Sequence, residues 1–169
     1  MTLEHPVAVR APRSLAEAAE AHLDDVLGYL LYLTRDRETA EDLTSATFEK
    51  ALRLWARFDA TRGSARTWLL GIARTTALDW FRAEARRRKR EEAAALPERV
   101  EEAFAEGLSP ELEAALATLS AGEREVLALR IVLELDGDAA ARVLGISPTA
   151  VSTRLSRALK RLEERVNEG

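Results

Sequence analysis

The fold is decided by residues 136–155, which read DGDAAARVLGISPTAVSTRL. This stretch predicts a helix, a tight turn and a second helix. Ala141 is small enough to let the two helices cross closely, and Gly145 can adopt the positive φ that ends the first helix. Val151 can then pack the second helix back onto the first. These three residues have the spacing that is typical of a DNA-binding helix-turn-helix.

The second of these helices is expected to have two different faces. Ser147 is its predicted N-cap and Pro148 its first residue. An apolar stripe follows on one side, made of Val151, Leu155, Ala158 and Leu162. The opposite side carries Thr149, Ser152, Thr153, Ser156, Arg157 and Lys160. Short hydroxyls followed by cations suit the base edges and phosphates of a major groove. A helical hairpin with such a turn also occurs in proteins that never bind DNA. The polar face of the second helix is therefore stronger evidence for DNA binding than the turn is.

Composition narrows the class of protein. The chain has 169 residues, of which 47% are hydrophobic and 32% charged, and it has no cysteine. No apolar run is long enough to cross a membrane, and the first residues lack the apolar core of a secretion signal, so we expect a cytoplasmic protein. Without cysteine, and with only the isolated His5 and His22, neither a metal site nor a cofactor is expected.

The net charge of −4 conceals an uneven distribution. Residues 35–90 carry 14 Lys or Arg against 8 acids, a net +6, whereas residues 91–121 carry 1 against 8, a net −7. The middle of the chain is therefore expected to attract nucleic-acid phosphates. The cationic run at residues 86–90 has a second interpretation, a solvated helix end whose charges favour the C-terminal dipole.

The rest of the chain predicts an all-α fold of two small helical domains. Apolar residues recur at helical spacing over about residues 14–33, 36–57 and 64–90, and no alternating strand pattern appears. Ser14 with Glu17 predicts a capping box, Asp36 and Ser64 are predicted helix starts, and residues 58–63 form a loop. We expect the first domain at 14–90 and an acidic linker at 91–108, where Glu and Ala dominate and Pro97 and Gly107 occur.

The second domain is expected at residues 109–169. Ser109 followed by Pro110 predicts its first helix, with Leu112, Leu116 and Leu119 facing inward. Ser120 and Glu123 predict a second capping box, opening a helix that carries Val126, Leu127, Arg130 and Leu133. This helix leads directly into the helix-turn-helix.

Four blocks resemble the bacterial extracytoplasmic-function sigma factors. They are AEDL at 40–43 followed by Thr47 and Phe48, WLLGIAR at 68–74, LDWFR at 78–82, and the LGIS turn at 144–147 with the helix after it. Four blocks in this order are hard to obtain by chance, and the resemblance covers roughly residues 20–165. It implies a region 2-like domain at 14–90 and a region 4-like domain at 109–169.

The resemblance implies two partners, core RNA polymerase and promoter DNA. Polymerase docking would involve Glu41, Asp42, Ser45 and Phe48, a polar rim around an apolar anchor. An ordinary amphipathic helix with Phe48 in the core is the alternative. Many relatives are held inactive by an anti-sigma factor, but no residue here identifies one. The acidic linker has two interpretations. It can mimic the negative charge of nucleic acid and enter a basic channel of the polymerase, or it can be a solvated spacer.

The implied minus-ten surface combines aromatic side chains with cations. Strand separation needs surfaces that receive unstacked bases and charges that hold the backbone. The candidates are Trp55, Phe58, Arg62, Ser64, Arg66, Trp68, Arg74, Thr75 and Arg82. Trp68 lies on an apolar stripe, which favours packing over base contact. Arg62 and Arg66 flank a glycine loop with little to pack against, which favours phosphate contact.

The implied minus-thirty-five surface is the polar face of the last helix. Its candidates are Ser147, Thr149, Ser152, Thr153, Arg154, Ser156, Arg157 and Lys160. The chain departs from the common family pattern at Ser45, Thr75 and Ser152, where Gln, Asn and a cation are frequent. These departures bear on which promoters are read.

A sigma factor is therefore the function that the sequence favours. The alternative is a self-sufficient dimeric helix-turn-helix regulator, which gives no role to the basic first domain. An enzyme finds no support, because the sequence has no glycine-rich phosphate loop and no nucleophile with a paired base.

Overall fold

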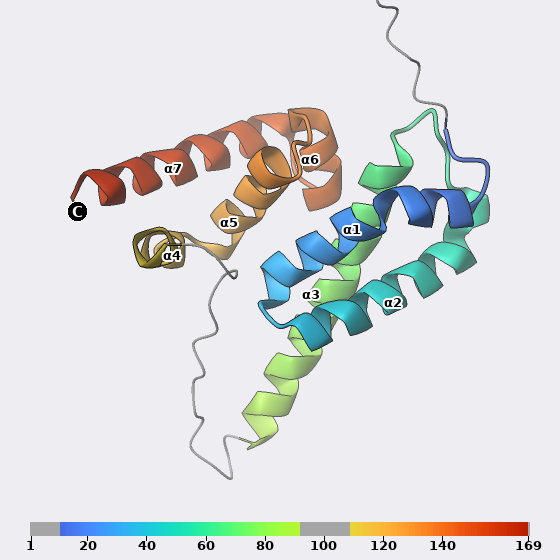
Figure 1. The fold of residues 1–169 in the computed structure, drawn as a ribbon, viewed down its shortest axis with the longest axis horizontal. Helices are drawn as coiled ribbons and strands as arrows, with labels where there is room; N and C mark the ends of the chain where they lie inside the picture. The colour runs from blue at the N-terminus through green and yellow to red at the C-terminus, as the bar shows by residue number, and fades with distance from the viewer. Residues whose placement is uncertain (1–10, 92–108, 169) are drawn as a thin grey trace, which may run out of the picture.

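The computed structural model describes residues 11–91 and 109–168, and the regular structure of these segments is helical (Figure 1). The first segment contains α1 (Leu15–Thr34), α2 (Arg37–Leu54), a 3₁₀ turn (Trp55–Arg57) and α3 (Ala65–Glu91). The second contains α4 (Pro110–Ala117), α5 (Ala121–Leu127), a π-helical turn (Ala128–Val132), α6 (Gly137–Leu144) and α7 (Pro148–Asn167). The predicted all-α class is confirmed. The acidic linker predicted at 91–108 lies outside the described residues apart from Glu91, which ends α3.

The first three helices pack on one another around an apolar core. Buried leucines, Leu30 from α1, Leu43 from α2 and Leu69 from α3, meet there. Small residues on the same faces let the helix axes approach closely. Thr47 is fully buried, and its hydroxyl donates to the carbonyl oxygen of Leu43 at 2.7 Å, so no polar atom of its side chain is left unsatisfied.

Side-chain caps fix the starts of these helices. The side chains of Ser14, Asp36 and Ser64 accept hydrogen bonds from backbone N–H groups three residues later, at 3.2, 3.2 and 3.1 Å. The full capping box predicted at Ser14 is wrong, however. The Glu17 carboxylate accepts from the N–H of Arg13 at 3.0 Å, because its long side chain reaches back past the N-cap.

The second segment contains the predicted helix-turn-helix. Gly145 ends α6 with φ 65 and ψ 32, and its N–H donates to the Ala141 carbonyl. Ser147 caps α7 by accepting from the Ala150 N–H at 3.1 Å. Ala141 and Val151 are buried where the two helices meet. The local prediction for this segment is confirmed residue by residue.

Helix α4 is less covered than predicted. Ser109 caps it as expected, and Leu116 and Leu119 are buried. Leu112 is 37% exposed, so its prediction as an inward residue is wrong. The physical reason is that α4 packs mainly against α7, which covers one side of so short a helix.

The capping box at Ser120 and Glu123 is confirmed. The Glu123 N–H donates to Ser120 Oγ at 3.2 Å, and the Ser120 N–H donates to Glu123 Oε2 at 3.0 Å. Arg161 from α7 also donates to this buried carboxylate at 3.1 Å. The start of α5 is thereby held against the middle of α7.

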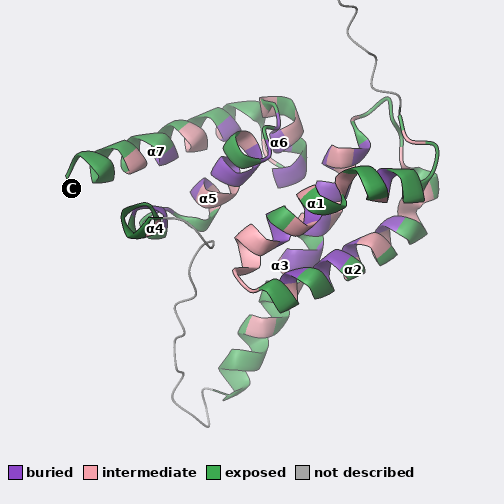
Figure 2. Ribbon diagram, in the orientation of Figure 1, coloured by how far each residue is buried: buried purple, intermediate pink, exposed green. Residues whose placement is uncertain are grey.

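The two halves of the chain share one continuous core. Leu69 and Leu70 of α3 belong to the same buried cluster as Leu129 and Val143 of the second half. The first turns of α3 lie beside α6, whereas its last turns project past the bundle and are largely exposed (Figure 2). Within the described segments, no helix has both the length and the apolar character needed to cross a bilayer.

The turn at Gly145 generates a stability prediction. Gly137 and Gly145 both have open space for an added Cβ, with nothing within 4 Å, but only Gly145 has a positive φ. Gly145→Val should therefore lower the free energy of unfolding by about 1–3 kcal/mol, and Gly137→Val by clearly less. Urea unfolding followed by circular dichroism measures both. Equal losses would mean that backbone strain is not what the glycine relieves.

Candidate nucleic-acid interface

Three aromatic side chains cluster where α2 gives way to the loop before α3. Trp55 stacks on Phe58 with ring centroids 5.0 Å apart and planes at 19°. Trp68 packs edge-on against Trp55 at 5.8 Å and tilted against Phe58 at 5.3 Å. All three are half-buried, and the packing favoured for Trp68 is what the structure has. The predicted aromatics are thus brought together.

A cavity of about 460 Å³ opens beside this cluster. Phe58 and Trp68 contribute aromatic lining, and Ser64, Thr67 and Thr75 contribute hydroxyl-bearing side chains. Its cations are Lys50, Arg57, Arg62 and Arg142. Aromatic faces with surrounding cations are the chemistry that single-stranded nucleic acid requires.

Arg142 is a cavity residue that sequence reasoning missed. It comes from α6, in the other half of the chain, and lies against the loop: a Cβ added at Gly63 would be 2.8 Å from its Nη1. In the sequence it is one more exposed cation on a helix. Its place beside the aromatic cluster depends on how the two halves pack, for which the sequence gives no local signal.

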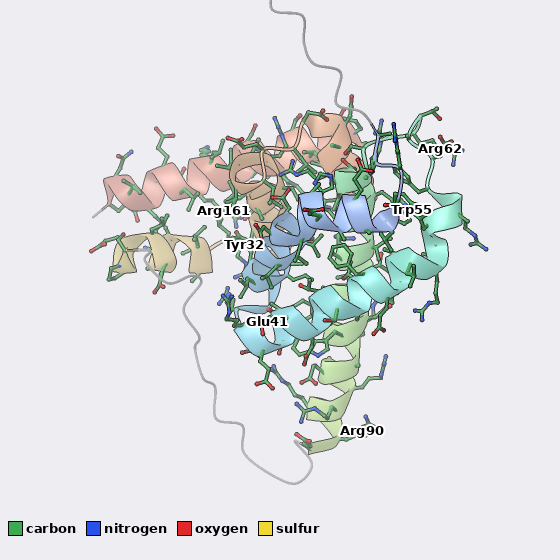
Figure 3. All side chains as sticks on the ribbon, turned by 45° about the vertical axis from the view of Figure 1, so that its right-hand side comes forward. Tyr32, Glu41, Trp55, Arg62, Arg90 and Arg161 are labelled. Atoms are coloured by element: carbon green, nitrogen blue, oxygen red, sulfur yellow. The ribbon has the colours of Figure 1, made fainter. Side chains whose placement is uncertain are left out.

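The structure contradicts the expectation that Arg66 has little to pack against. Its Nε donates to Asp25 Oδ2 of α1 at 2.7 Å, and its Nη2 donates to the carbonyl oxygen of Leu133. These partners come from both halves of the chain, which close over the start of α3. Arg62, by contrast, is exposed on the loop at one end of α2, with Glu41 near the other end (Figure 3).

Arg74 is also engaged, in a cluster with Glu125 and Tyr29. Its Nε and Nη2 donate to Glu125 Oε1 and Oε2 at 2.9 and 3.3 Å, and the Tyr29 hydroxyl donates to Oε1 at 3.0 Å. The side chains of Arg74 and Glu125 are only 23% and 12% exposed. Burial lowers the pKa of the Arg74 guanidinium, but the hydrogen bonds and charge of Glu125 outweigh it, so the pKa is raised.

The remaining minus-ten candidates have more local roles. The Ser64 hydroxyl caps α3, and the Thr75 hydroxyl donates to the Gly71 carbonyl at 3.0 Å. Arg82 lies on the projecting part of α3, 3.5 Å from Asp79. It is therefore separated along α3 from the loop and cavity.

The predicted docking residues divide into two groups. Glu41, Asp42 and Ser45 are exposed on one face of α2, with Glu41 paired to Arg37 at 3.0 Å. Phe48 is half-buried and packs against the core. The outer face of α2 therefore offers acids without an exposed aromatic ring, which agrees with the alternative placement of Phe48.

The polar face of α7 is open. The exposed side chains along it are Thr149, Ser152, Thr153, Ser156, Arg157 and Lys160. Two further candidates are partly committed within the protein. Ser147 serves as the N-cap, and the half-buried Arg154 lies against α5, with its Nη1 3.3 Å from where a Cβ on Gly122 would be.

Comparison with known proteins gives matches over both halves of the chain. Residues 18–87 match the family model of sigma-70 region 2, and residues 109–162 match that of sigma-70 region 4. The chain is 37% identical over 150 residues to the ECF RNA polymerase sigma factor SigC of Mycobacterium tuberculosis, covering 86% of this chain and 80% of that one. It is 29% identical to the ECF RNA polymerase sigma factor SigX of Bacillus subtilis, covering 86% and 79%.

Solved structures share the fold. The sigma factor RpoE of Bartonella quintana, in complex with the anti-sigma factor NepR, superposes with a TM-score of 0.74 at 23% identity, over 90% of this chain and 96% of that one. CnrH, in complex with the cytosolic domain of CnrY, gives 0.67 at 25% identity, over 92% and 89%.

The tyrosines generate a pH prediction. Burial and the charge of Glu125 raise the pKa of Tyr29 well above 10.0, and burial raises the pKa of Tyr32, the only other tyrosine. Because the folded pKa values exceed the unfolded ones, both phenols stabilise the fold below pH 10.0, and this contribution is lost as the pH rises through the folded values.

Tyrosinate absorbance should therefore appear at higher pH in the native chain than in the urea-unfolded chain. Tyr29→Phe should remove the larger of the two shifts and leave that of Tyr32. Native and unfolded titration curves that coincide would contradict the buried placement of Tyr29 and the half-buried placement of Tyr32.

Proposed function

This chain belongs to the extracytoplasmic-function group of the sigma-70 family of RNA polymerase sigma factors, which direct promoter-specific transcription initiation, and we propose how its surfaces divide that work. The observation that carries the proposal is the presence of three different surfaces on one chain. They are the acidic face of α2, the cationic aromatic cavity before α3, and the open polar face of α7.

The acidic face of α2 is proposed to dock on core RNA polymerase. Glu41, Asp42 and Ser45 project from it, and charged groups around an interface guide association and orientation. Phe48 supports this surface from beneath, by packing against the core. Because the inner face of α2 packs on the core, its outer face holds these acidic side chains in fixed positions.

The loop and α3 are proposed to bind the minus-ten element and hold it open. Trp55, Phe58 and Trp68 supply aromatic surface, and Arg62 supplies an exposed charge at the cavity. Arg66, Arg74 and Arg82 extend the cationic surface along α3, and Ser64 and Thr75 add hydroxyls. Stacking with backbone neutralisation suits an unpaired strand better than a closed duplex.

The polar face of α7 is proposed to read the minus-thirty-five element. Its hydroxyls lie near the helix start, where a recognition helix meets base edges, and Arg157 and Lys160 follow one to two turns later. Ser147 supports this face by capping α7, and Arg154 lies against Gly122 of α5.

We further propose that the chain acts in the cytoplasm, without catalytic activity or a cofactor of its own. We propose an anti-sigma factor as a further partner, because the similar solved structures contain RpoE in complex with the anti-sigma factor NepR and CnrH in complex with the cytosolic domain of CnrY. The acidic segment at 91–108 remains a proposed tether between the two DNA-binding parts.

Reconstitution with core RNA polymerase tests the function directly. The polymerase should start RNA synthesis at defined sites only when this chain is added, and the isolated chain should bind promoter duplex weakly. Asp42→Lys should reduce co-purification with core polymerase, because it reverses a charge on the docking face. Glu20→Lys, the same change at an exposed site on α1, should not.

Two results would count against this assignment. Start sites that do not depend on the chain would remove the sigma function, and a footprint by the chain alone would favour the dimeric regulator. Equal effects of the Asp42 and Glu20 variants would remove α2 as the docking face.

Base reading by α7 has its own prediction. Arg157→Ala should weaken binding to the upstream element by roughly 1–3 kcal/mol and relax base preference at one position, if the guanidinium contacts a base. Arg165→Ala, near the far end of the same helix, removes the same charge and should have little effect. Transcription from promoters with single-base changes measures the preference, and an equal loss on every promoter would assign Arg157 to phosphate.

A further inference from the structure

The cavity proposed for the minus-ten element has an acid among the cations of its lining. The cations are Lys50, Arg57, Arg62 and Arg142, and the acid is Asp59. Asp59 is exposed, and it lies on the loop that joins the 3₁₀ turn to α3, shortly before Arg62. A carboxylate in this place repels nucleic-acid phosphates, so attraction of DNA does not explain why it is there.

Asp59 is tied to the loop by its side chain and by its carbonyl oxygen. Its Oδ1 accepts from the backbone N–H of Thr61 at 2.9 Å and from the Thr61 hydroxyl at 2.6 Å. Its carbonyl oxygen accepts from the N–H of Arg62 at 3.1 Å. An aspartate that bonds to the backbone two residues later closes a tight local turn. Asp59 therefore sets the path of the backbone from Phe58 to Arg62.

The far end of the loop is held by the start of α3. The Thr67 N–H donates to Ser64 Oγ at 3.1 Å, and the Trp68 N–H donates to the Ser64 carbonyl oxygen at 3.1 Å. The loop is thus anchored on one side by Asp59 and on the other by a helix cap, and Arg62 lies between the two anchors (Figure 3). A backbone that is ordered in advance loses less entropy when the loop binds a strand.

We propose that Asp59 is a positioning residue for promoter melting, whose carboxylate holds the loop in the conformation that presents Arg62 to the unpaired strand without contacting DNA itself. The inference rests on the proposed function, because it takes this loop to bind the minus-ten element. The hydrogen bonds from Thr61 lower the pKa of the Asp59 carboxyl, so the carboxylate is ionised at neutral pH. Its negative charge then opposes DNA binding, and the ordering of the loop outweighs this repulsion.

Two neutral replacements of Asp59 separate the hydrogen bonds from the charge. Asp59→Asn keeps an oxygen that accepts from Thr61 but removes the negative charge, whereas Asp59→Ala removes both. The full-length chain is assembled with core RNA polymerase on a promoter taken from the start sites of the wild-type chain. The fluorescence of 2-aminopurine placed in the minus-ten segment then measures the rate of opening.

Asp59→Ala should open the promoter about 2- to 10-fold more slowly than the wild type, the factor that corresponds to ordering one further side chain on binding. Asp59→Asn should open it at least as fast as the wild type, because the loop hydrogen bonds are kept and the repulsion is gone. Equal rates for Asp59→Ala and the wild type would overturn the inference. So would a loss in Asp59→Asn as large as that in Asp59→Ala, which would assign the charge itself to contact with a base.

Thr61 offers an independent pair of variants in case removal of the aspartate side chain disturbs the fold. Thr61→Val has nearly the same shape but lacks the hydroxyl that donates to Asp59, and Thr61→Ser keeps a hydroxyl. Thr61 is exposed, so both variants should melt at the temperature of the wild type. Thr61→Val should open the promoter more slowly than Thr61→Ser, and equal rates would contradict the role of the anchor.

The wild-type chain gives the separate readout of the proposed function. If the wild-type chain with core polymerase leaves the minus-ten segment closed, the proposed function fails, and the role of Asp59 fails with it. If the wild type opens the segment, the proposed function holds, and the ratios among the variants decide the role of Asp59 alone.

Discussion

The pairing of Glu125 with Arg74 is the contact on which the arrangement of the two halves depends. A carboxylate that is only 12% exposed requires a partner of opposite charge, because an unpaired buried charge costs several kcal/mol. Arg74 and Tyr29 supply the hydrogen bonds, and both come from the first half of the chain. The position of α5 on α1 and α3 is therefore specified by polar geometry as well as by the shared apolar core.

The same side chains serve two purposes that exclude one another. Arginines suit both buried carboxylates and nucleic-acid phosphates, because their planar donors match either acceptor. Arg66 and Arg74 therefore hold the two halves of the chain together with the same donors that the proposed DNA contacts would use. The side chains of Arg62, Thr149 and Ser152 are exposed, so they can meet DNA without breaking a contact between the two halves.

Much of the local structure could be predicted because it follows from short-range rules. The caps at Asp36, Ser109 and Ser147 were predictable from residue type and position, and the burial of Val151 and Ala158 in α7 was predictable from their helical spacing. The sequence predictions were wrong where contacts with other parts of the chain determined the exposure or the hydrogen bond of a residue. Leu112 is exposed because α4 meets mainly one other helix, and the carboxylate of Glu17 caps one residue earlier than expected.

The sequence by itself determined the helices, the turn at Gly145 and the residue types of each polar face, because backbone sterics and helical periodicity act within a few residues. The tertiary structure alone decided that Arg66 and Arg74 are engaged by partners far away in the sequence. Arg74 meets Glu125 across 51 positions, Arg66 meets Leu133 across 67, and Tyr29 meets Glu125 across 96. No local pattern encodes such pairings, since they arise only when the apolar faces of the two halves have already closed on one another.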